Sequence, residues 1–285
     1  MSMKEARLRN DVFLPVIGAG LWKITDRQLM AEVVKNAWQC GYRLFDTASA
    51  YSNELALGKA VSELGLPREQ IIIQDKLWTT CYGYENAQAA CRHSLKKLKT
   101  DYLDVYLMHW PAPSKLYDNW EEINAETWRG MEQLYKEGYV RAIGVCNFKI
   151  SHLEALGKTA AVHPLINQIE CHPGMPNKEI TEYCRKKEIR IQASSPLGNG
   201  QILNNAELLR IAAESGITAA QLCLKWSLEH GYIILPKTTS PERMRENFCS
   251  WQLNLDKDIM HLLDNLPFCG GLAIDSDEVN KFDEL

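Results

Sequence analysis

Short apolar runs alternate with amphipathic stretches along the chain. The amphipathic stretches have the apolar spacing of helices, as in DRQLMAEVVKNAWQCG (26–41), NAQAACRHSLKKLKTD (86–101), TWRGMEQLYKEG (127–138) and SPERMRENF (240–248). The apolar runs predict strands: PVIGAGLW (15–22), YRLFDTA (42–48), IIIQDKLW (71–78), YLDVYLMHW (102–110), VRAIGVCNF (140–148), LINQIECHP (165–173), IRIQASSPLG (189–198) and YIILPKT (232–238). Regular strand–helix order implies parallel strands, because each crossover must be long enough to hold a helix.

Eight such units in a chain of 285 residues predict one closed barrel rather than two doubly wound domains. The fold class is therefore α/β, a (β/α)8 TIM barrel. The segment ARLRNDVFLPV (6–16) has a polar centre between apolar flanks and predicts an N-terminal β-hairpin before the first barrel strand. No linker rich in Gly, Ser or Pro divides the chain, so residues 1–285 are expected to form a single domain.

Composition narrows the possible partners. A net charge of -4 gives no basic field for nucleic acid or an anionic membrane. The opening MSMKEARLRND lacks the apolar core of a signal peptide, and no apolar run is long enough to span a bilayer. The nine cysteines are odd in number, scattered, and without a Cys-x-x-Cys pair, so reduced thiols in a cytoplasmic protein are expected.

Four polar residues fall at or just after the C-terminal ends of predicted strands, where barrels of this class carry their active sites. Asp46, Lys76 and His109 end the second, third and fourth strands, and Tyr51 follows Asp46 by five residues. Singly, each has a structural explanation: a buried hydrogen bond at a corner, a lysine reaching the rim, or a core histidine. Together they predict a group of catalytic residues that transfers a proton.

The charges of this group indicate its chemistry. A tyrosine keeps its proton up to a pKa of about 10, and a nearby Lys76 cation favours the phenolate. Tyr51 is therefore expected to be a better acid near neutral pH. Asp46 would hold Lys76 charged, and His109 would position a substrate oxygen against Tyr51. Such a group suits protonation of an oxygen that gains negative charge as a hydride reaches its carbon.

A second candidate feature is the segment LPKTTSPERMREN (235–247). Ser240 can cap a helix with Pro241 at its first position. Arg243 and Asn247 are four residues apart and share one face of that helix. Cations, hydroxyls and a helix N-terminus together predict an anion site, although a solvated helix start has the same composition. The preceding turn supplies Lys237, Thr238 and Thr239.

The motifs GAGLWK, FDTASAYSNE, KLW, MHWP, GVCNF, NQIECHP, SPLG and LPKTTSPERMREN, in this order, resemble the aldo-keto reductases across essentially the whole chain. The similarity is to bacterial-type members of the 2,5-diketogluconate reductase and aldehyde reductase kind, which act on small aldehydes, dicarbonyls and keto sugars. The resemblance implies a carbonyl reductase that uses NADPH/NADP+ without metal or flavin. It also implies that the residues matching Asp46, Tyr51, Lys76 and His109 are the catalytic tetrad, with tyrosine as proton donor.

The resemblance further implies the cofactor contacts. The adenosine 2′-phosphate would meet Lys237, Thr238 and Arg243, and the adenine would lie near Glu246 and Asn247. The carboxamide of the nicotinamide would meet Cys146, Asn147 and Gln168. The other implied cofactor-binding residues are Gly20, Leu21, Trp22, Asp46, Ser194, Ser195, Leu197 and Thr239.

Two positions depart from the family pattern. Most members have serine at the position of Cys146, so one hydrogen bond to the carboxamide is expected to be weaker or absent. Many members stack an aromatic residue on the nicotinamide ring where this chain has Ser194. NADPH binding is therefore expected to be weaker than in a Ser194→Tyr or Ser194→Trp variant.

The substrate-binding residues are expected beside the tetrad. Tryptophans at strand ends suit an apolar-walled pocket for a small-molecule carbonyl substrate, although they could also cap the barrel core. The loop 111–124 and the tail 268–285 are expected to form walls of an open, permissive site. A monomer or a weak dimer is expected. The predicted substrate contacts are Trp22, Trp78, His109 and Trp110.

Three alternatives remain beside NADPH-dependent reduction of aldehydes and ketones to alcohols. A metal-dependent hydrolase could use His109, Glu170 and His172, but the strand ends lack the His-x-His and carboxylate set of that chemistry, and no metal is expected. A lyase could form a Schiff base on Lys76. A catalytically inactive scaffold or redox sensor of the same fold would be expected to lose tetrad residues, and all four are present.

Overall fold

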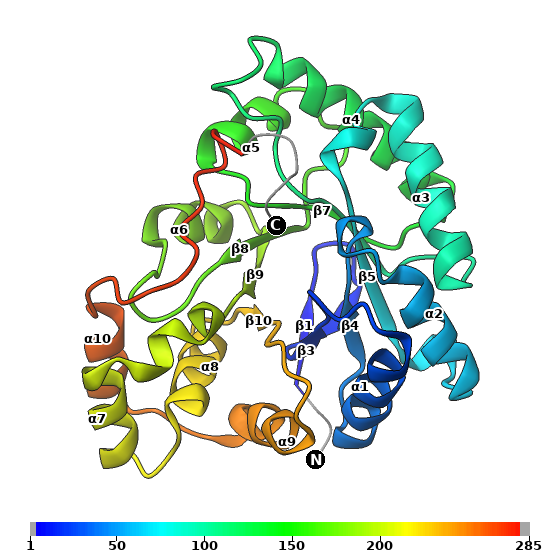
Figure 1. Ribbon diagram of the computed structural model, residues 1–285. Coiled ribbons are helices and arrows are strands. Elements are labelled where there is room, and N and C mark those ends of the chain that lie inside the picture. The colour runs from blue at the N-terminus through cyan, green and yellow to red at the C-terminus, as the bar shows by residue number, and fades with distance from the viewer. Residues whose placement is uncertain (1–3, 280–285) are drawn as a thin grey trace.

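The structure, a computed structural model, describes residues 4–279. Eight parallel strands form its centre and helices surround them (Figure 1). The strands are β3 (Gly18–Gly20), β4 (Leu44–Asp46), β5 (Ile72–Leu77), β6 (Val105–Met108), β7 (Ile143–Cys146), β8 (Ile166–Glu170), β9 (Arg190–Ser194) and β10 (Ile233–Ile234).

Each barrel strand pairs in parallel with its sequence neighbour, from β3 through to β10. The two ends of this sheet meet where Ile17 forms a parallel bridge with Ile234. The amide of Ile234 also donates to the carbonyl of Val16 over 2.9 Å. The sheet is therefore a nearly closed barrel, and the fold class predicted from the alternating pattern is confirmed.

The helices cover the outside of the barrel (Figure 1). Asp26 caps the first helix by accepting from the amide of Leu29, and Gly41 ends it with a φ of 105°. Both predicted boundaries are thus confirmed. The helices are α1 (Arg27–Cys40), α2 (Glu54–Glu63), α3 (Tyr84–Leu98), α4 (Trp120–Lys136), α5 (Ile150–Gly157), α6 (Lys178–Lys186), α7 (Ala206–Glu214), α8 (Ala219–Glu229), α9 (Pro241–Cys249) and α10 (Lys257–Asp264).

Helix α4 begins earlier than the sequence pattern predicts. Trp120 is its first residue, so only 111–119 of the predicted loop 111–124 is a loop. Glu121 and Glu122 lie in the first turn, where carboxylates interact favourably with the positive end of the helix dipole. These acidic residues explain why a polar stretch extends the helix instead of the loop.

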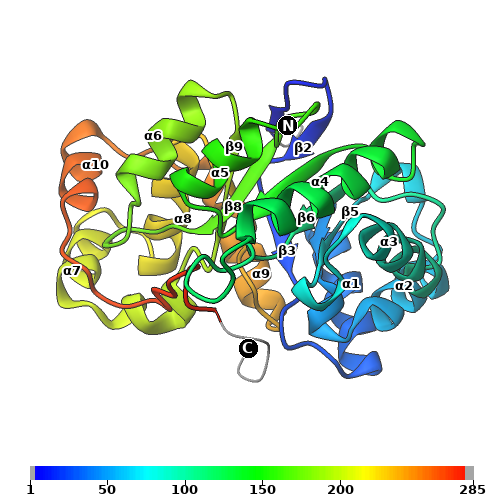
Figure 2. The same cartoon turned by 90° about the horizontal axis from the view of Figure 1, so that it is seen from above.

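The predicted N-terminal hairpin is present as β1 (Glu5–Arg7) and β2 (Phe13–Pro15), which pair antiparallel. Arg9, in its turn, donates hydrogen bonds to the carbonyls of His163 and Pro164, which precede β8. The hairpin thus lies across the N-terminal end of the barrel, at the end of the molecule opposite the chain's C-terminal tail (Figure 2).

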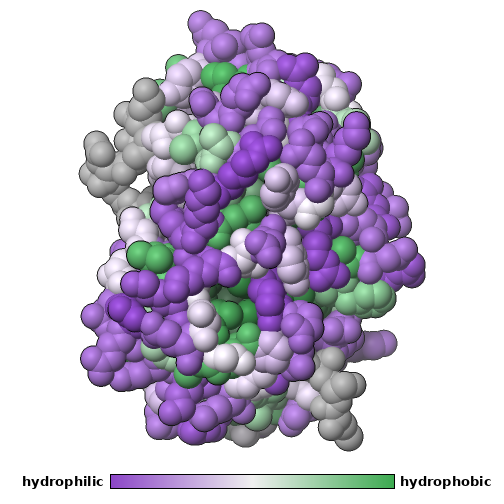
Figure 3. Space-filling model, turned by 90° about the vertical axis from the view of Figure 1, so that its right-hand side faces the viewer, coloured by the Kyte–Doolittle hydropathy of each residue, from purple (hydrophilic) through white to green (hydrophobic). Residues whose placement is uncertain are grey.

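The molecular surface and the state of the cysteines are consistent with the expectations drawn from the composition. One side of the molecule is mainly hydrophilic, with hydrophobic residues in small separate patches (Figure 3). Within residues 4–279, no helix combines the length and apolar character needed to cross a membrane. All nine cysteines are free, as expected of reduced thiols, and Cys91, Cys184 and Cys223 are among the buried ones.

Candidate active site

A cavity of about 1610 Å³ opens at the C-terminal ends of the barrel strands. It brings together residues that the sequence analysis drew from distant segments. Leu21, Trp78 and Thr239 are not among its lining residues, and Lys76 lies buried behind its wall. The predicted residues that line it are Gly20, Trp22, Asp46, Tyr51, His109, Trp110, Cys146, Asn147, Gln168, Ser194, Ser195, Leu197, Lys237, Thr238, Arg243, Glu246 and Asn247.

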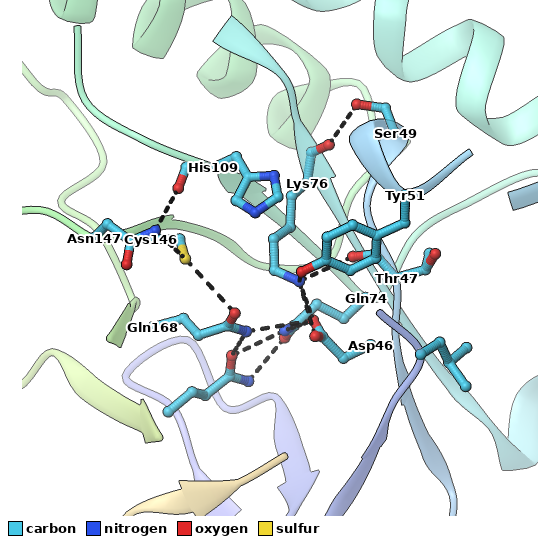
Figure 4. Close-up of polar contacts among 12 residues, drawn as sticks. Asp46, Thr47, Ser49, Tyr51, Gln74, Lys76, His109, Cys146, Asn147 and Gln168 are labelled. Carbon is cyan, nitrogen blue, oxygen red and sulfur yellow. Dashed lines mark hydrogen bonds and ion pairs between the residues drawn. The ribbon is translucent and has the colours of Figure 1, made fainter. Parts of the chain in front are cut away.

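Lys76 is the centre of the polar cluster at the base of this cavity (Figure 4). Its Nζ lies 2.7 and 2.8 Å from the two carboxylate oxygens of Asp46. The same atom lies 3.0 Å from the carbonyl of Thr47 and 3.3 Å from the hydroxyl of Tyr51. The fully buried ammonium group therefore joins the carboxylate to the phenol.

Local structure places Tyr51 beside Lys76. Tyr51 ends a short 3-10 helix, η1 (Ser49–Tyr51), that follows strand β4. The hydroxyl of Ser49 donates to the carbonyl of Lys76 over 2.9 Å, which ties this turn to β5. The phenol is thus held against the neighbouring strand by the Ser49 side chain as well as by its own hydroxyl.

The charges of the cluster differ in one respect from the sequence-based expectation. Burial lowers the pKa of Lys76, but the carboxylate of Asp46 outweighs it and the pKa rises, so Lys76 remains charged as predicted. Burial raises the pKa of Tyr51 to about 12, because loss of hydration outweighs the opposing effect of the Lys76 cation. The expectation of a more acidic phenol was therefore wrong for this state. Tyr51 keeps its proton at neutral pH.

His109 faces the same cluster as a neutral group. Burial and the nearby Lys76 cation both lower its pKa well below the ordinary value of 6.5. Its ring lies edge-on to Tyr51 and to Trp78, with centroid separations of 5.6 and 5.0 Å. Trp78 thus packs against His109 instead of lining the cavity. A neutral imidazole can hydrogen-bond a substrate oxygen without adding a second cation beside Lys76.

Beneath the cavity, the barrel interior holds two buried glutamines that the sequence analysis missed. Gln74 Nε2 donates to Asp46 Oδ1 over 2.6 Å. Gln192 pairs with Gln74 and also accepts from Gln168. The strand period would have revealed them, because residues two positions apart share a face. Gln74 lies two positions before Lys76, and Gln192 two before Ser194.

The two departures from the family pattern both line the cavity. Cys146 Sγ lies 3.6 Å from Gln168 Oε1 and 3.2 Å from Asn147 Nδ2. Burial raises the pKa of the Cys146 thiol to about 12, so it keeps its proton and offers a weak donor. Ser194 places a small side chain at the end of β9, where an aromatic ring would fill more of the cavity.

The other end of the cavity has the features of an anion site. Ser240 caps α9 by accepting from the amide of Arg243, with Pro241 at the first position, as predicted. Thr238 Oγ1 accepts from the amide of Ser240 over 3.2 Å. Within the described residues, the cavity-lining cations Lys237 and Arg243 have no carboxylate partner. The free cations and the helix N-terminus therefore suit a phosphate group.

The C-terminal tail forms part of the cavity wall. The carboxylate of Glu170 accepts hydrogen bonds of 2.9 Å from the amides of Leu272 and Ala273. Further along, the hydroxyl of Ser276 donates to the carbonyl of Asn147 over 2.6 Å. Residues 272–274 and 276 line the cavity, as predicted for the tail. Residues 280–285 of the predicted wall lie outside the described residues.

The loop 111–119 supports the tail and does not line the cavity, contrary to the sequence-based expectation. Ser114 donates to Asp277 over 2.8 Å, and Lys115 pairs with Glu278. Lys149, which follows the adjacent strand β7, pairs with Asp277 over 2.6 Å. Polar side chains in the tail thus bind the loop after β6 and the segment after β7, so the tail and not the loop borders the cavity here.

The residues of the metal-hydrolase alternative serve other roles. His109 belongs to the Tyr51 cluster, whereas Glu170 holds the tail and lies 3.6 Å from His172. Burial would raise the pKa of Glu170, but the neighbouring His172 and the hydrogen bonds from the tail amides keep it lowered. Within residues 4–279, no group of three or more His, Cys, Asp or Glu side chains is arranged to hold a metal ion.

Comparison with known proteins gives consistent matches. The family model described as "Aldo/keto reductase family" matches residues 16–267. Glyoxal reductase of Bacillus subtilis (strain 168) is 41% identical over 266 residues, covering 93% of this chain and 94% of that protein. Methylglyoxal reductase DkgA of Salmonella typhimurium is 39% identical over 254 residues, covering 88% of this chain and 89% of that protein.

A solved structure extends the comparison to the fold and a cofactor. The crystal structure of a single-residue mutant of Gox0644 in complex with NADPH superposes with a TM-score of 0.90 and 33% sequence identity. The match covers 98% of this chain and 100% of that chain. The similarity therefore includes the barrel and the segments that line its cavity.

Proposed function

The chain belongs to the aldo/keto reductase family, and from this premise we propose that it reduces small aldehydes and ketones to alcohols with NADPH. The observation that carries the proposal is the protonated Tyr51 hydroxyl, 3.3 Å from the Lys76 cation at the base of an open cavity. Family membership makes the protein an oxidoreductase that acts on carbonyl groups. The proposal concerns the cofactor, the substrate class and the role of each residue.

Tyr51 is the proton donor in this proposal. As negative charge develops on the carbonyl oxygen of the substrate, the O–H bond of Tyr51 breaks and its proton moves to that oxygen. Lys76, 3.3 Å away, stabilises the phenolate that remains. Asp46 keeps Lys76 charged and fixed, and neutral His109 donates a hydrogen bond that orients the carbonyl.

The cavity fits a dinucleotide, which supplies the hydride when bound. Its volume of about 1610 Å³ exceeds the ~300–1,000 Å³ of ordinary small-molecule sites and leaves room for a second, small molecule. Lys237, Thr238 and Arg243 would hold the 2′-phosphate, which favours NADPH over NADH, with Thr239 in the same turn. Glu246 and Asn247 would border the adenine, and Asn147 and Gln168 the carboxamide.

The remaining cofactor positions follow the cavity wall. A Cβ added at Gly20 would lie 2.9 Å from the carbonyl oxygen of Leu235, so this glycine permits a close strand approach there. Leu21 lies under the wall and packs in the core. The other positions that would border the cofactor are Trp22, Asp46, Cys146, Ser194, Ser195 and Leu197.

The proposed substrates are small aldehydes and dicarbonyls of the glyoxal and methylglyoxal kind. The names of the two bacterial relatives support this class. Trp22 and Trp110 line the cavity and provide apolar walls near His109, with Trp78 packed behind that ring. In this proposal few polar groups contact the substrate around its carbonyl, which favours a broad range of carbonyl substrates over selection of a single one.

A Tyr51→Phe variant tests the function. We expect the wild type to consume NADPH, followed by its absorbance, when methylglyoxal is supplied. The variant should lose almost all of this rate and bind NADPH nearly as the wild type does. Tyr183→Phe, on α6 outside the cavity, is the matched control and should keep its rate. A Tyr51→Phe variant that keeps most of its rate would assign the proton to another donor.

The NADPH assay, together with a borohydride trap for Lys76, separates the two remaining alternatives. A wild type that binds NADPH but reduces no carbonyl would favour the scaffold or redox sensor. An adduct on Lys76 trapped by borohydride, without NADPH consumption, would favour the lyase.

The nine free cysteines support a reducing, cytoplasmic setting. A monomer or weak dimer is proposed, and size-exclusion chromatography would test it.

A further inference from the structure

Three glutamines from different strands meet under the cavity: Gln74 on β5, Gln168 on β8 and Gln192 on β9. All three side chains are buried. Gln74 Nε2 lies 2.9 Å from Gln192 Oε1, and Gln192 Nε2 lies 2.8 Å from Gln74 Oε1. These two amides therefore form a reciprocal pair. Gln168 reaches the cavity surface, whereas Gln74 and Gln192 do not.

The carboxylate of Asp46 determines which atom of each amide in this pair is the nitrogen and which is the oxygen. Asp46 forms an ion pair with Lys76 through both oxygens, and an ionised carboxylate can only accept hydrogen bonds. The atom of Gln74 that lies 2.6 Å from Asp46 Oδ1 must therefore be the nitrogen. Its oxygen then faces the nitrogen of Gln192, and the oxygen of Gln192 remains as an acceptor.

The orientation of the Gln192 amide in turn fixes the orientation of the Gln168 amide. Its Nε2 lies 3.1 Å from Gln192 Oε1 and 3.3 Å from Asp46 Oδ1, so both amide hydrogens are used by acceptors in the interior. The oxygen of Gln168 is therefore the atom left on the cavity side. Within residues 4–279, the donor it meets is the thiol of Cys146, at 3.6 Å, which is a weak one.

We propose that Gln74 and Gln192 are positioning residues that fix the amide of Gln168, so that it presents an acceptor, and not a donor, to the nicotinamide carboxamide. The inference rests on the proposed use of NADPH. The group recognised is the N–H of that carboxamide. Neither positioning residue lines the cavity: Gln192 acts through its hydrogen bond from Gln168, and Gln74 acts through Gln192 and Asp46. Without them only the longer contact of 3.3 Å with Asp46 Oδ1 holds the Gln168 nitrogen in the interior, so the amide turns over more readily and places its nitrogen toward the ligand.

The test compares two dinucleotides. NADP+ carries the carboxamide, whereas its 3-acetylpyridine analogue keeps the carbonyl and replaces the amino group with methyl. The wild type should bind NADP+ more tightly than the analogue by about three- to tenfold, the value of one hydrogen bond. Gln74→Met and Gln192→Met keep similar length without the amide, and each should lower this ratio toward one.

Two controls separate positioning from general damage. Adenosine 2′,5′-bisphosphate has no nicotinamide, so its dissociation constant should be the same in the wild type and all variants. Gln88→Met removes another buried glutamine, on α3 and away from the cavity, and should keep the wild-type ratio. Because Gln74 and Gln192 lie on different strands, one variant suffices if the other does not fold.

The outcomes separate the inference from the function on which it rests. A wild type that binds neither NADP+ nor the bisphosphate would overturn the proposed function and this inference with it. A wild type that binds both dinucleotides equally would overturn the acceptor role of Gln168 alone. Folded Gln74→Met and Gln192→Met variants that bind the bisphosphate normally and keep the wild-type ratio would overturn the positioning role.

Discussion

Replacing Asp75 with asparagine should stabilise the protein at neutral and alkaline pH. Asp75 precedes Lys76 on β5 and is fully buried. Burial and the nearby carboxylate of Glu54 raise its pKa to about 7, against the opposing effects of Ser94 and Lys76, and within the described residues neither carboxylate oxygen has a hydrogen-bond partner. Lys97 binds only one oxygen of Glu54, and the other has no partner within the described residues. Asparagine has a similar shape and carries no charge, so it removes the cost of a buried charge and the repulsion from Glu54.

The sign and size of the effect follow from proton linkage. In the unfolded chain Asp75 loses its proton near its ordinary pKa of 3.8, whereas the folded chain holds it up to about 7. The folded state thus binds more protons across this range, and its stability falls as the pH rises from about 4 to about 7. At 1.4 kcal/mol per pKa unit, the full loss is on the order of 4 kcal/mol.

Urea unfolding at pH 5, 6, 7 and 8, followed by tryptophan fluorescence and circular dichroism, measures this loss. Asp75→Asn should have the higher free energy of unfolding, and its advantage over the wild type should grow from about 2 kcal/mol at pH 5 to on the order of 4 kcal/mol at pH 8. Asp104→Asn is a matched control, because Asp104 is equally buried but pairs with Arg68 and Arg141. Asp104→Asn should lower the free energy of unfolding at pH 8. The reasoning is refuted if Asp75→Asn loses stability with pH as the wild type does.

Three further predictions concern the cavity. Removing Lys237 and Arg243 together by alanine should reduce the preference for NADPH over NADH by about tenfold or more, measured as the ratio of dissociation constants; an unchanged ratio would remove the phosphate assignment. Ser194→Trp should bind NADPH more tightly in a fluorescence titration, and equal or tighter binding by the wild type would contradict the stacking argument. Glu170→Gln should weaken the hydrogen bonds to the tail amides and raise KM for methylglyoxal severalfold, with NADPH affinity unchanged; a lower NADPH affinity would show that Glu170 acts elsewhere.

The sequence was sufficient for the barrel and for the polar cluster, because both depend on local patterns. Strand and helix periods are visible within single segments, and Asp46, Lys76 and His109 each end an apolar run. Tyr51 could be assigned to the same cluster because it follows Asp46 by only five residues. The resulting cluster needed only the rule that parallel strand ends meet at one edge of a barrel.

Features that depend on distant contacts were not predictable in this way. Gln74 and Gln192 are 118 positions apart, and their pairing follows from the closure of the barrel. The raised pKa of Tyr51 depends on how much water its surroundings exclude, which no pattern of residue types states. Glu170 binds tail amides more than a hundred positions away, so its role as an anchor is invisible in the strand that carries it.

The hairpin that lies across the N-terminal end of the barrel has a consequence for the order of events in turnover. The hairpin covers that end, and the interior of such a barrel is filled by side chains, so both ligands are expected to use the cavity's opening at the other end. We therefore expect cofactor and substrate to obstruct each other at this opening, so that the order of binding and the rate of product release both influence the turnover rate.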